Sequence, residues 1–318
     1  MQFGLHAGTR GAAMDPDGLL TIARRAEALG FTHLGLSDHV VIAREVNSPY
    51  PYTKTGKWFA QDSGECLDQL TALAFVAAGT TTLRLLTSVM VLPHRPVVLT
   101  AKMLTTIDHL SRGRLTVGVG VGWMEEEIIA LGAPTFKGRG KLADEYIEGF
   151  RELWTQDDPE YAGEYVNFNG ILFEPKPTQK PYPPIWIGGE TKPARRRAGK
   201  MGDGWYPVNN NPAAPYDTLD RYAAGLADMR AQADVAGRDP SAIETGLITV
   251  GYRMGEADQL DDGSRKPFTG SADDILNDVG TFRDGGLNHM IVGFESDDLQ
   301  RSLDTIEKFA EAVMGKIG

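Results

Sequence analysis

Short apolar runs alternate with segments of helical periodicity along almost the whole chain. In the first unit, the apolar run 3–7 is short enough for a strand. Asp15 and Pro16 then begin a segment whose apolar residues recur at helical spacing as far as Gly30. Such alternation is typical of parallel strands joined by helices, and no linker sequence interrupts it.

The alternation predicts eight strands with at least eight helices. The strands are expected at residues 3–7, 33–37, 83–92, 115–121, 185–187, 204–206, 246–253 and 289–294. Eight parallel strands keep no exposed sheet edge when they close into a barrel. We therefore predict a single domain over residues 1–318, a (β/α)8 TIM barrel of the α/β class with loop and hairpin insertions. A doubly wound open sheet is the alternative.

Three segments are expected to be insertions. Residues 40–65 form a long loop, and because a disordered segment seldom carries many aromatic side chains, we expect this loop to be a lid. Its aromatic residues are Tyr50, Tyr52, Trp58 and Phe59. Residues 166–173 predict a hairpin, since Asn169 and Gly170 suit a type I′ turn. The acidic, glycine-rich segment 255–269 is expected to be flexible.

Charge and cysteine content exclude several classes of protein. With 32 Lys and Arg against 43 Asp and Glu, the formal net charge is −11, which is unsuited to binding nucleic-acid phosphates or anionic lipid. No apolar window of about 18 residues predicts a membrane span. The single cysteine, Cys66, excludes an internal disulfide and fits a reducing compartment. We expect a cytoplasmic protein with no nucleic-acid or membrane partner.

The sequence lacks several established nucleotide and hydrolase motifs. The glycines within 118–122 fail the dinucleotide-binding pattern, because Trp123 and Glu125 occupy the positions of its third glycine. A Walker A loop, a zinc-protease motif and a Gly-x-Ser-x-Gly elbow are missing too. We therefore predict no metal site. One alternative stays open, a metal held by three histidines at one end of the barrel: His6, His39 and His94.

Four motifs lie at or near the ends of predicted strands. They are Ser37-Asp38-His39, Thr87-Ser88-Val89, the glycine-spaced segment 118–123 and the segment 183–189. Together they resemble the luciferase-like monooxygenase superfamily, and within it the branch that uses the deazaflavin coenzyme F420. The resemblance spans most of the chain and implies a barrel-shaped oxidoreductase.

This resemblance implies an F420-dependent oxidoreductase that transfers a hydride between the coenzyme and a small organic substrate. An FMN-dependent monooxygenase of the same superfamily, fed by a separate flavin reductase, is the alternative. A coenzyme-binding protein without turnover is a second alternative. Because relatives are commonly dimers, the resemblance also implies a homodimer.

Asp38 and His39 follow the second predicted strand, where a barrel gathers its functional side chains. Histidine can give or take a proton near neutral pH. The resemblance implies that His39 is catalytic and abuts the redox-active part of the coenzyme ring, while Asp38 contacts the ring edge. The alternative is a purely structural role, in which Asp38 caps the following loop and His39 packs against its neighbours.

The remaining candidate residues are implied to bind the coenzyme. The resemblance predicts a cis peptide between Ser88 and Val89, in a bulge that backs the ring; by composition alone these are ordinary strand residues. Glycines allow the backbone to approach a ligand closely or to pack tightly. Those singled out are Gly120, Gly122, Gly188 and Gly189. The last two, with Thr191 at the start of a helix, suit a coenzyme phosphate.

The sequence departs from the F420-dependent sugar-phosphate dehydrogenases at one informative position. Trp123 stands where those enzymes carry a catalytic glutamate, so glucose-6-phosphate dehydrogenase activity is not expected. Trp123 is instead expected to form an apolar wall, which favours an uncharged or aromatic substrate. Residues 125–127 are all glutamates, and we expect them to form an exposed first helical turn.

Overall fold

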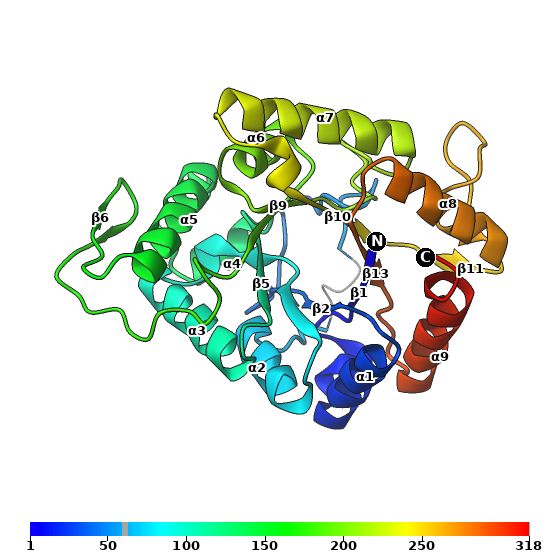
Figure 1. Cartoon of the computed structure of the whole chain (residues 1–318), viewed down its shortest axis with the longest axis horizontal. Helices are drawn as coiled ribbons and strands as arrows, with labels where there is room; N and C mark the ends of the chain where they lie inside the picture. The colour runs from blue at the N-terminus through cyan, green and yellow to red at the C-terminus, as the bar shows by residue number, and fades with distance from the viewer. Residues whose placement is uncertain (59–62, 318) are drawn as a thin grey trace.

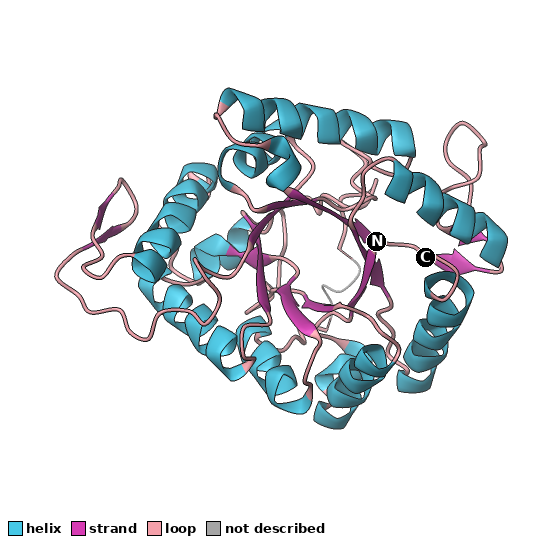
Figure 2. Ribbon diagram, viewed as in Figure 1, coloured by secondary structure: helices cyan, strands magenta, loops and turns pink. Residues whose placement is uncertain are grey.

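Parallel strands form a closed ring at the centre of the computed structural model, which describes residues 1–58 and 63–317 (Figure 2). Within this described part, the order around the ring is β3-β2-β1-β13-β10-β9-β8-β5-β4, and pairing of β3 with β5 closes it. The bounds are β1 (Gln2–His6), β2 (His33–Leu36), β3 (Arg84–Thr87), β4 (Met90–Val91), β5 (Leu115–Gly120), β8 (Ile185–Gly188), β9 (Gly204–Tyr206), β10 (Glu244–Thr249) and β13 (His289–Gly293). Since β3 and β4 are two parts of one interrupted strand, the ring has eight positions and is the predicted TIM barrel.

Helices surround the ring on its outer side (Figures 1 and 2). They are α1 (Pro16–Ala28), α2 (Gln69–Gly79), α3 (Val97–Leu110), α4 (Glu125–Ala130), α5 (Arg139–Thr155), α6 (Lys192–Met201), α7 (Leu219–Val235), α8 (Ala272–Asp284) and α9 (Leu299–Phe309). Short 3₁₀ turns lie at Gly11–Met14, Leu92–His94 and Pro240–Ala242, and a π-helical turn, Ala310–Met314, extends α9. Local sequence sets the helix starts: the Asp15 side chain accepts the Gly18 N–H at 2.7 Å, and Ser271 with Asp274 forms a capping box.

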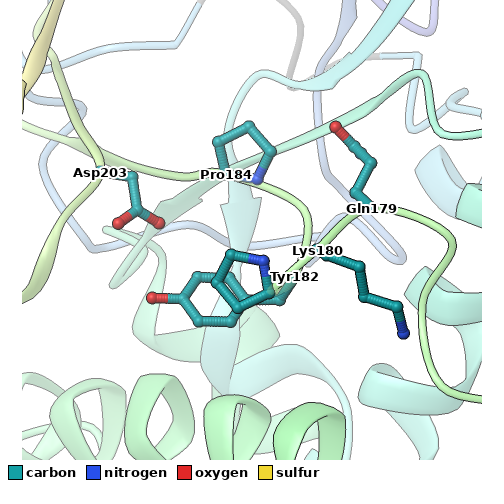
Figure 3. A pocket seen from close by; sticks show the side chains of 6 residues that line it. Gln179, Lys180, Tyr182, Pro184 and Asp203 are labelled. Atoms are coloured by element: carbon teal, nitrogen blue, oxygen red, sulfur yellow. The ribbon is translucent and has the colours of Figure 1, made fainter.

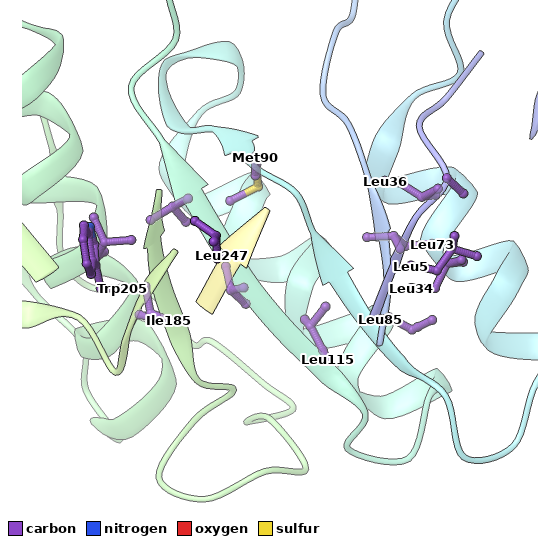
Figure 4. Close-up of a cluster of buried hydrophobic side chains, with 14 of the residues drawn as sticks. Leu5, Leu34, Leu36, Leu73, Leu85, Met90, Leu115, Ile185, Trp205 and Leu247 are labelled. Carbon is purple, nitrogen blue, oxygen red and sulfur yellow. The ribbon is translucent and has the colours of Figure 1, made fainter. Parts of the chain in front are cut away.

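Neighbouring residues of one strand serve two different cores. Leu85 belongs to the main core between strands and helices, whereas Leu86 belongs to a small core inside the barrel. The same alternation holds for three more pairs, Ile185/Trp186, Trp205/Tyr206 and Met290/Ile291. Figure 4 shows part of the main core, with side chains from several strands and from α2 packed together. Both faces of the strands are therefore apolar, as in other sheets covered by helices.

Two sequence predictions concerning strands are corrected. The expected strand 83–92 is interrupted at Ser88 and Val89. The expected Asn169–Gly170 turn is wrong: the hairpin pairs β6 (Tyr161–Ala162) with β7 (Asn167–Phe168), and its turn lies at 163–166. The buried Glu145 carboxylate of α5 accepts three backbone N–H groups of that turn, from residues 164–166. This tertiary contact has no local sequence signal.

The acidic segment 255–269 folds back on the rest of the chain. Two short parallel strands, β11 (Arg253–Met254) and β12 (Thr269–Gly270), flank it, and Arg265 bonds to Asp278 of α8 at 2.6 Å. Its flexibility stays a prediction. In the part of the chain described above, no helix is both long enough and apolar enough to cross a membrane.

Candidate active site

The carboxyl ends of the barrel strands bring the predicted site residues to one end of the barrel, here called the mouth. Asp38 and His39 follow β2, Ser88 and Val89 interrupt the β3–β4 strand, and the four glycines end or follow β5 and β8. Parallel strands all finish at the same end, which is why residues 150 positions apart in sequence converge. Thr191 lies just beyond, as the exposed residue that precedes α6.

His39 is held by a buried carboxylate. Its Nδ1 lies 2.7 Å from Oε2 of Glu127, and the imidazole is 15% exposed. The ring packs at a tilt of 34° against Trp58, with a centroid distance of 4.5 Å, and makes an edge contact with Trp123 at 6.3 Å. His39 is therefore fixed by a hydrogen bond to a carboxylate and by two aromatic side chains, which is more than passive packing requires.

Glu127 corrects the expectation of an exposed acidic turn. Its side chain is only 1% exposed, and Oε1 accepts the N–H groups of Val40 at 2.7 Å and Val41 at 3.2 Å. Burial opposes ionisation, but the contacts with His39, His94 and the Val40 N–H outweigh it and lower the pKa of Glu127. Three consecutive glutamates look alike in sequence; helical geometry turns only the third toward His39.

Asp38 lies beneath this pair and is almost fully buried. Its carboxylate accepts the Val91 N–H at 2.8 Å and both terminal nitrogens of Arg95 at 2.9 Å. Burial alone would raise the pKa of Asp38, yet contacts with His94 and Arg95 lower it to about 2. The carboxylate thus fixes Val91 at the end of β4, and contact with a coenzyme ring stays a prediction.

His94 connects the two carboxylates. Its Nδ1 is 3.6 Å from Asp38 Oδ2, and its Nε2 is 3.7 Å from Glu127 Oε2. His6 lies elsewhere, in a pair with Glu295, so the three histidines of the metal alternative do not converge. Among the described residues, no group of His, Cys, Asp or Glu is arranged to hold a metal ion.

The peptide between Ser88 and Val89 is cis, as the resemblance predicted. Side chains from two other strands hold this bulge: His6 Nε2 lies 3.2 Å from the Ser88 carbonyl, and the Ser88 hydroxyl lies 3.0 Å from the Tyr206 hydroxyl. His6 Nδ1 is also 2.7 Å from Glu295 Oε1. Burial alone would lower the pKa of His6, but these two acceptors outweigh it and raise the pKa. These contacts favour the protonated form of His6 next to the bulge, a role that sequence reasoning missed.

Tight packing around Val89 accounts for two of the four predicted glycines. A Cβ atom on Gly120 would lie 2.8 Å from one Val89 methyl group, and a Cβ atom on Gly188 would lie 2.9 Å from the other. Gly122 and Gly189 have φ angles of +78° and +112°, which other residues rarely adopt. The tight-packing alternative thus accounts for Gly120 and Gly188 without a ligand, and their contact with coenzyme stays a prediction.

A second buried carboxylate stands between the glycine pair and α6. Glu190 accepts the Val208 N–H at 2.9 Å and the Asn211 amide at 2.8 Å, and burial raises its pKa. The basic run of α6 supports this region: Arg195 donates to the Glu190 carbonyl at 2.7 Å, and Arg197 pairs with Asp144 of α5. Sequence analysis missed Glu190, although its place directly after Gly188-Gly189 was a usable signal.

The described part of the predicted lid, residues 40–58 and 63–65, packs over His39. Tyr50 lies 5.1 Å from Trp123 between ring centroids and 5.3 Å from Tyr52, and Trp58 is 8% exposed. Burial and the charge of Glu190 raise the pKa of Tyr52. Phe59, the fourth aromatic residue of the prediction, lies outside the described residues. These contacts support the lid interpretation, because the aromatic side chains are used to cover the mouth.

A separate cavity has a volume of about 380 Å³, and Figure 3 shows the residues that line it. Its lining includes Gln179 and Pro184, which precede β8, and Asp203, which precedes β9. Residues before a strand lie at its amino end, so this cavity is remote from His39. A TIM barrel carries out its chemistry at the carboxyl ends, and we assign the candidate active site to the mouth.

The mouth has features that suit a flat, polar-edged cofactor. The Ser88–Val89 bulge offers an apolar support, and the His6 imidazole contacts it from β1. Asn210 follows β9 at the same end, and its Oδ1 is buried without a hydrogen-bond partner in the described structure. Such an atom normally has a partner, so it suits a ligand that donates an N–H or O–H group.

The sequence model of luciferase-like monooxygenases matches residues 1–259. The chain belongs to the luciferase-like monooxygenase family. An uncharacterised protein of Mycobacterium tuberculosis is 31% identical over 306 residues, which cover 94% of this chain and 95% of that protein. The FMNH2-dependent dimethylsulfone monooxygenase of Pseudomonas putida is 33% identical over 172 residues, which cover 54% of this chain and 44% of that enzyme.

Solved structures of luciferase-like proteins share the fold. A monooxygenase from Streptomyces bottropensis superposes with a TM-score of 0.75 at 21% identity, covering 99% of both chains. An F420-dependent secondary alcohol dehydrogenase in complex with an F420–acetone adduct also gives 0.75, at 19% identity, covering 100% of this chain and 99% of that one. The predicted family and the predicted barrel are therefore confirmed.

Proposed function

We propose that this luciferase-like protein is an F420-dependent oxidoreductase that transfers a hydride between the coenzyme and a small organic substrate. The observation that carries the proposal is the mouth itself, where His39, held by Glu127, follows β2, and the Ser88–Val89 bulge interrupts the adjacent β3–β4 strand. The F420-dependent secondary alcohol dehydrogenase of the same fold supports the choice of coenzyme. The hydride chemistry would come from the coenzyme when bound.

The residues of the mouth divide the task of holding that coenzyme. The Ser88–Val89 bulge would support the ring, and the backbone N–H groups at the start of α6, after Gly188, Gly189 and Thr191, would face its phosphate. His39 would exchange a proton with the substrate through the imidazole. General acid–base catalysis of this kind contributes about 100- to 10,000-fold to the rate.

The aromatic cover indicates the class of substrate. Apolar surface surrounds His39, provided by Trp123, Tyr50 and Trp58. These three side chains are uncharged, so they cannot form an ion pair with a charged substrate. A small uncharged or aromatic molecule suits these walls better than a sugar phosphate does. The absence of a glutamate at position 123 agrees with this choice.

An FMN-dependent monooxygenase is the second candidate, favoured by the FMNH2-dependent relative from Pseudomonas putida. The deciding experiment is titration of the purified chain with F420 and, separately, with FMN, each followed by absorbance and by quenching of coenzyme fluorescence. We expect saturable F420 binding that is at least tenfold tighter than FMN binding. Tighter FMN binding, with oxygen consumption in the presence of a flavin reductase, would replace the first proposal by the second.

Three further expectations stay proposals of the same kind. A coenzyme-binding protein without turnover would bind F420 but reduce or oxidise no member of a broad panel of uncharged alcohols, aldehydes and ketones. The homodimer implied by the resemblance predicts twice the chain mass of 34.6 kDa in sedimentation equilibrium. A cytoplasmic location rests on the cysteine content alone.

A further inference from the structure

One buried carboxylate holds both the candidate catalytic histidine and the first residues of the lid. Glu127 Oε2 contacts His39 Nδ1 at 2.7 Å, while Oε1 accepts the backbone N–H groups of Val40 and Val41. An ionised carboxylate can only accept hydrogen bonds. His39 must therefore carry a proton on Nδ1, which makes Nε2 the proton-accepting nitrogen of the neutral ring.

The contacts around Glu127 favour its ionised form. His94 lies 3.7 Å from Glu127 Oε2, and Asp38 on the other side of His94 is itself paired with Arg95. The remaining neighbours of the His39 ring are aromatic, and Arg10 lies over the outer one, with its guanidinium carbon 4.6 Å from the Trp58 ring centroid. A buried carboxylate with this many hydrogen-bond partners is stable in its ionised form. A neutral side chain at position 127 would change which hydrogen-bonding group lies opposite His39 Nδ1.

The neighbouring glutamate provides a natural comparison within the same helical turn. Glu126 Oε1 accepts the N–H groups of Asn47 at 2.7 Å and Ser48 at 3.1 Å, further along the lid. Glu126 is therefore also fastened to the lid, and these bonds, unlike those of Glu127, do not include His39. Comparing variants of Glu126 and Glu127 therefore distinguishes an effect on lid attachment from an effect on the orientation of His39.

We propose that Glu127 is a positioning residue, which fixes His39 in the Nδ1–H tautomer and ties that ring to the base of the lid. The proposal deepens the proposed function, because it specifies which nitrogen of His39 would exchange the proton. The same positioning role for Glu127 would hold with either F420 or FMN, because either reaction at the mouth would use the imidazole in a fixed orientation.

The test is Glu127→Gln, with Glu126→Gln as the matched control. In Glu127→Gln, the new amide oxygen can still accept the N–H groups of Val40 and Val41 if the amide NH2 group faces His39 Nδ1. That NH2 group is a hydrogen-bond donor, so Nδ1 must then be the acceptor. Glu127→Gln should therefore convert His39 to the Nε2–H tautomer, whereas Glu126→Gln should leave the tautomer unchanged. Both are read from ¹⁵N chemical shifts of histidine-labelled chain without coenzyme, in mildly alkaline buffer.

Limited proteolysis distinguishes orientation from folding. Glu127→Gln should leave the cleavage rate of the lid within about twofold of the parent, while Glu127→Ala, which loses the lid bonds as well, should raise it at least fivefold. An unchanged His39 tautomer in Glu127→Gln, or the same tautomer change in Glu126→Gln, would overturn the proposal. Neither readout needs turnover, so failure of the proposed function would be seen separately in the coenzyme titrations.

Discussion

Histidines and carboxylates meet at both ends of the barrel, with opposite consequences. At the mouth, His39 and His94 contact Glu127 and Asp38, two carboxylates that are almost fully buried. At the amino ends of the strands, here called the floor, four side chains from β2, β8, β10 and β13 come together: His33, Trp186, Glu244 and His289. There the carboxylate, Glu244, is about half exposed, and the histidine rings pack on an indole.

The difference lies in how each end handles charge. Contacts lower the pKa of both mouth carboxylates despite burial, so the mouth keeps fixed charges in a nearly dry environment. At the floor, burial and repulsion from neighbouring cations lower the pKa of His33 far below its usual value, so that ring is kept neutral. Fixed charge can orient a proton carrier, whereas a neutral packed ring mainly fills space.

The largest expected difference between the two ends concerns catalysis. His39→Ala should reduce turnover by about 100- to 10,000-fold because it removes the proton carrier, while coenzyme binding should change little. Steady-state kinetics and coenzyme titration on the same preparation measure both. His33→Gln at the floor is the control, and its turnover should be close to the parent's. Retained turnover in His39→Ala would remove the proton-transfer role.

Next in size is the stability of the buried ion pair at the mouth. Asp38→Asn removes one of the two carboxylates paired with the Arg95 guanidinium, which is only 10% exposed, and leaves Asp68 as the other. It should lower the free energy of unfolding by about 3 kcal/mol. The exposed pair of Lys54 with Asp261 is the control, so Asp261→Asn should have no measurable effect. Urea unfolding followed by tryptophan fluorescence checks both variants.

The same pair predicts the acid limit of stability. Because the folded pKa of Asp38 is about 2, below its unfolded value, its contribution is complete above about pH 4 and is lost as pH falls toward 2. The difference in unfolding free energy between the parent and Asp38→Asn should therefore shrink over that window. A constant difference would mean that the Asp38 charge is not the source of the stabilisation.

A glycine at the mouth should give an intermediate effect. In Gly188→Ala the new methyl group would lie 2.9 Å from a Val89 methyl group and 3.2 Å from the Val119 carbonyl oxygen, so the bulge must shift. We expect a loss of about 1–3 kcal/mol in unfolding free energy. Coenzyme affinity should fall as well if Val89 supports the ring. Gly280→Ala in α8 is the control, since its added Cβ meets nothing within 4 Å.

The smallest expected effect comes from the floor and has a different pH window. A histidine held neutral when folded binds its proton only when the chain unfolds, so His33 costs stability as pH falls below about 6.5. His33→Gln should flatten the stability profile between about pH 7 and 5. Thermal unfolding across that range measures it, and an unaltered slope would show that His33 is charged in the folded protein.

Local sequence signals predicted most of the framework and part of the site. Apolar alternation located the barrel strands to within a few residues, and the family motifs placed Asp38, His39, Ser88 and Val89 at one end, including the cis peptide. The signals failed where a partner lies far away along the chain. Glu127 was expected to be exposed and is the partner of His39, 88 residues earlier.

The sequence by itself determined where strands and helices form. The spacing of apolar residues differs between the two, because it depends on which residues of each element face a core. The sequence also determined the chain order of the units, and hence that residues after each strand gather at the mouth. Only the tertiary structure decided which polar groups pair there, since the orientation of His6 and His39 depends on Glu295 and Glu127, carboxylates that the closed barrel brings to 2.7 Å. Burial strengthens such pairings, and burial is a property of the folded barrel rather than of any single segment.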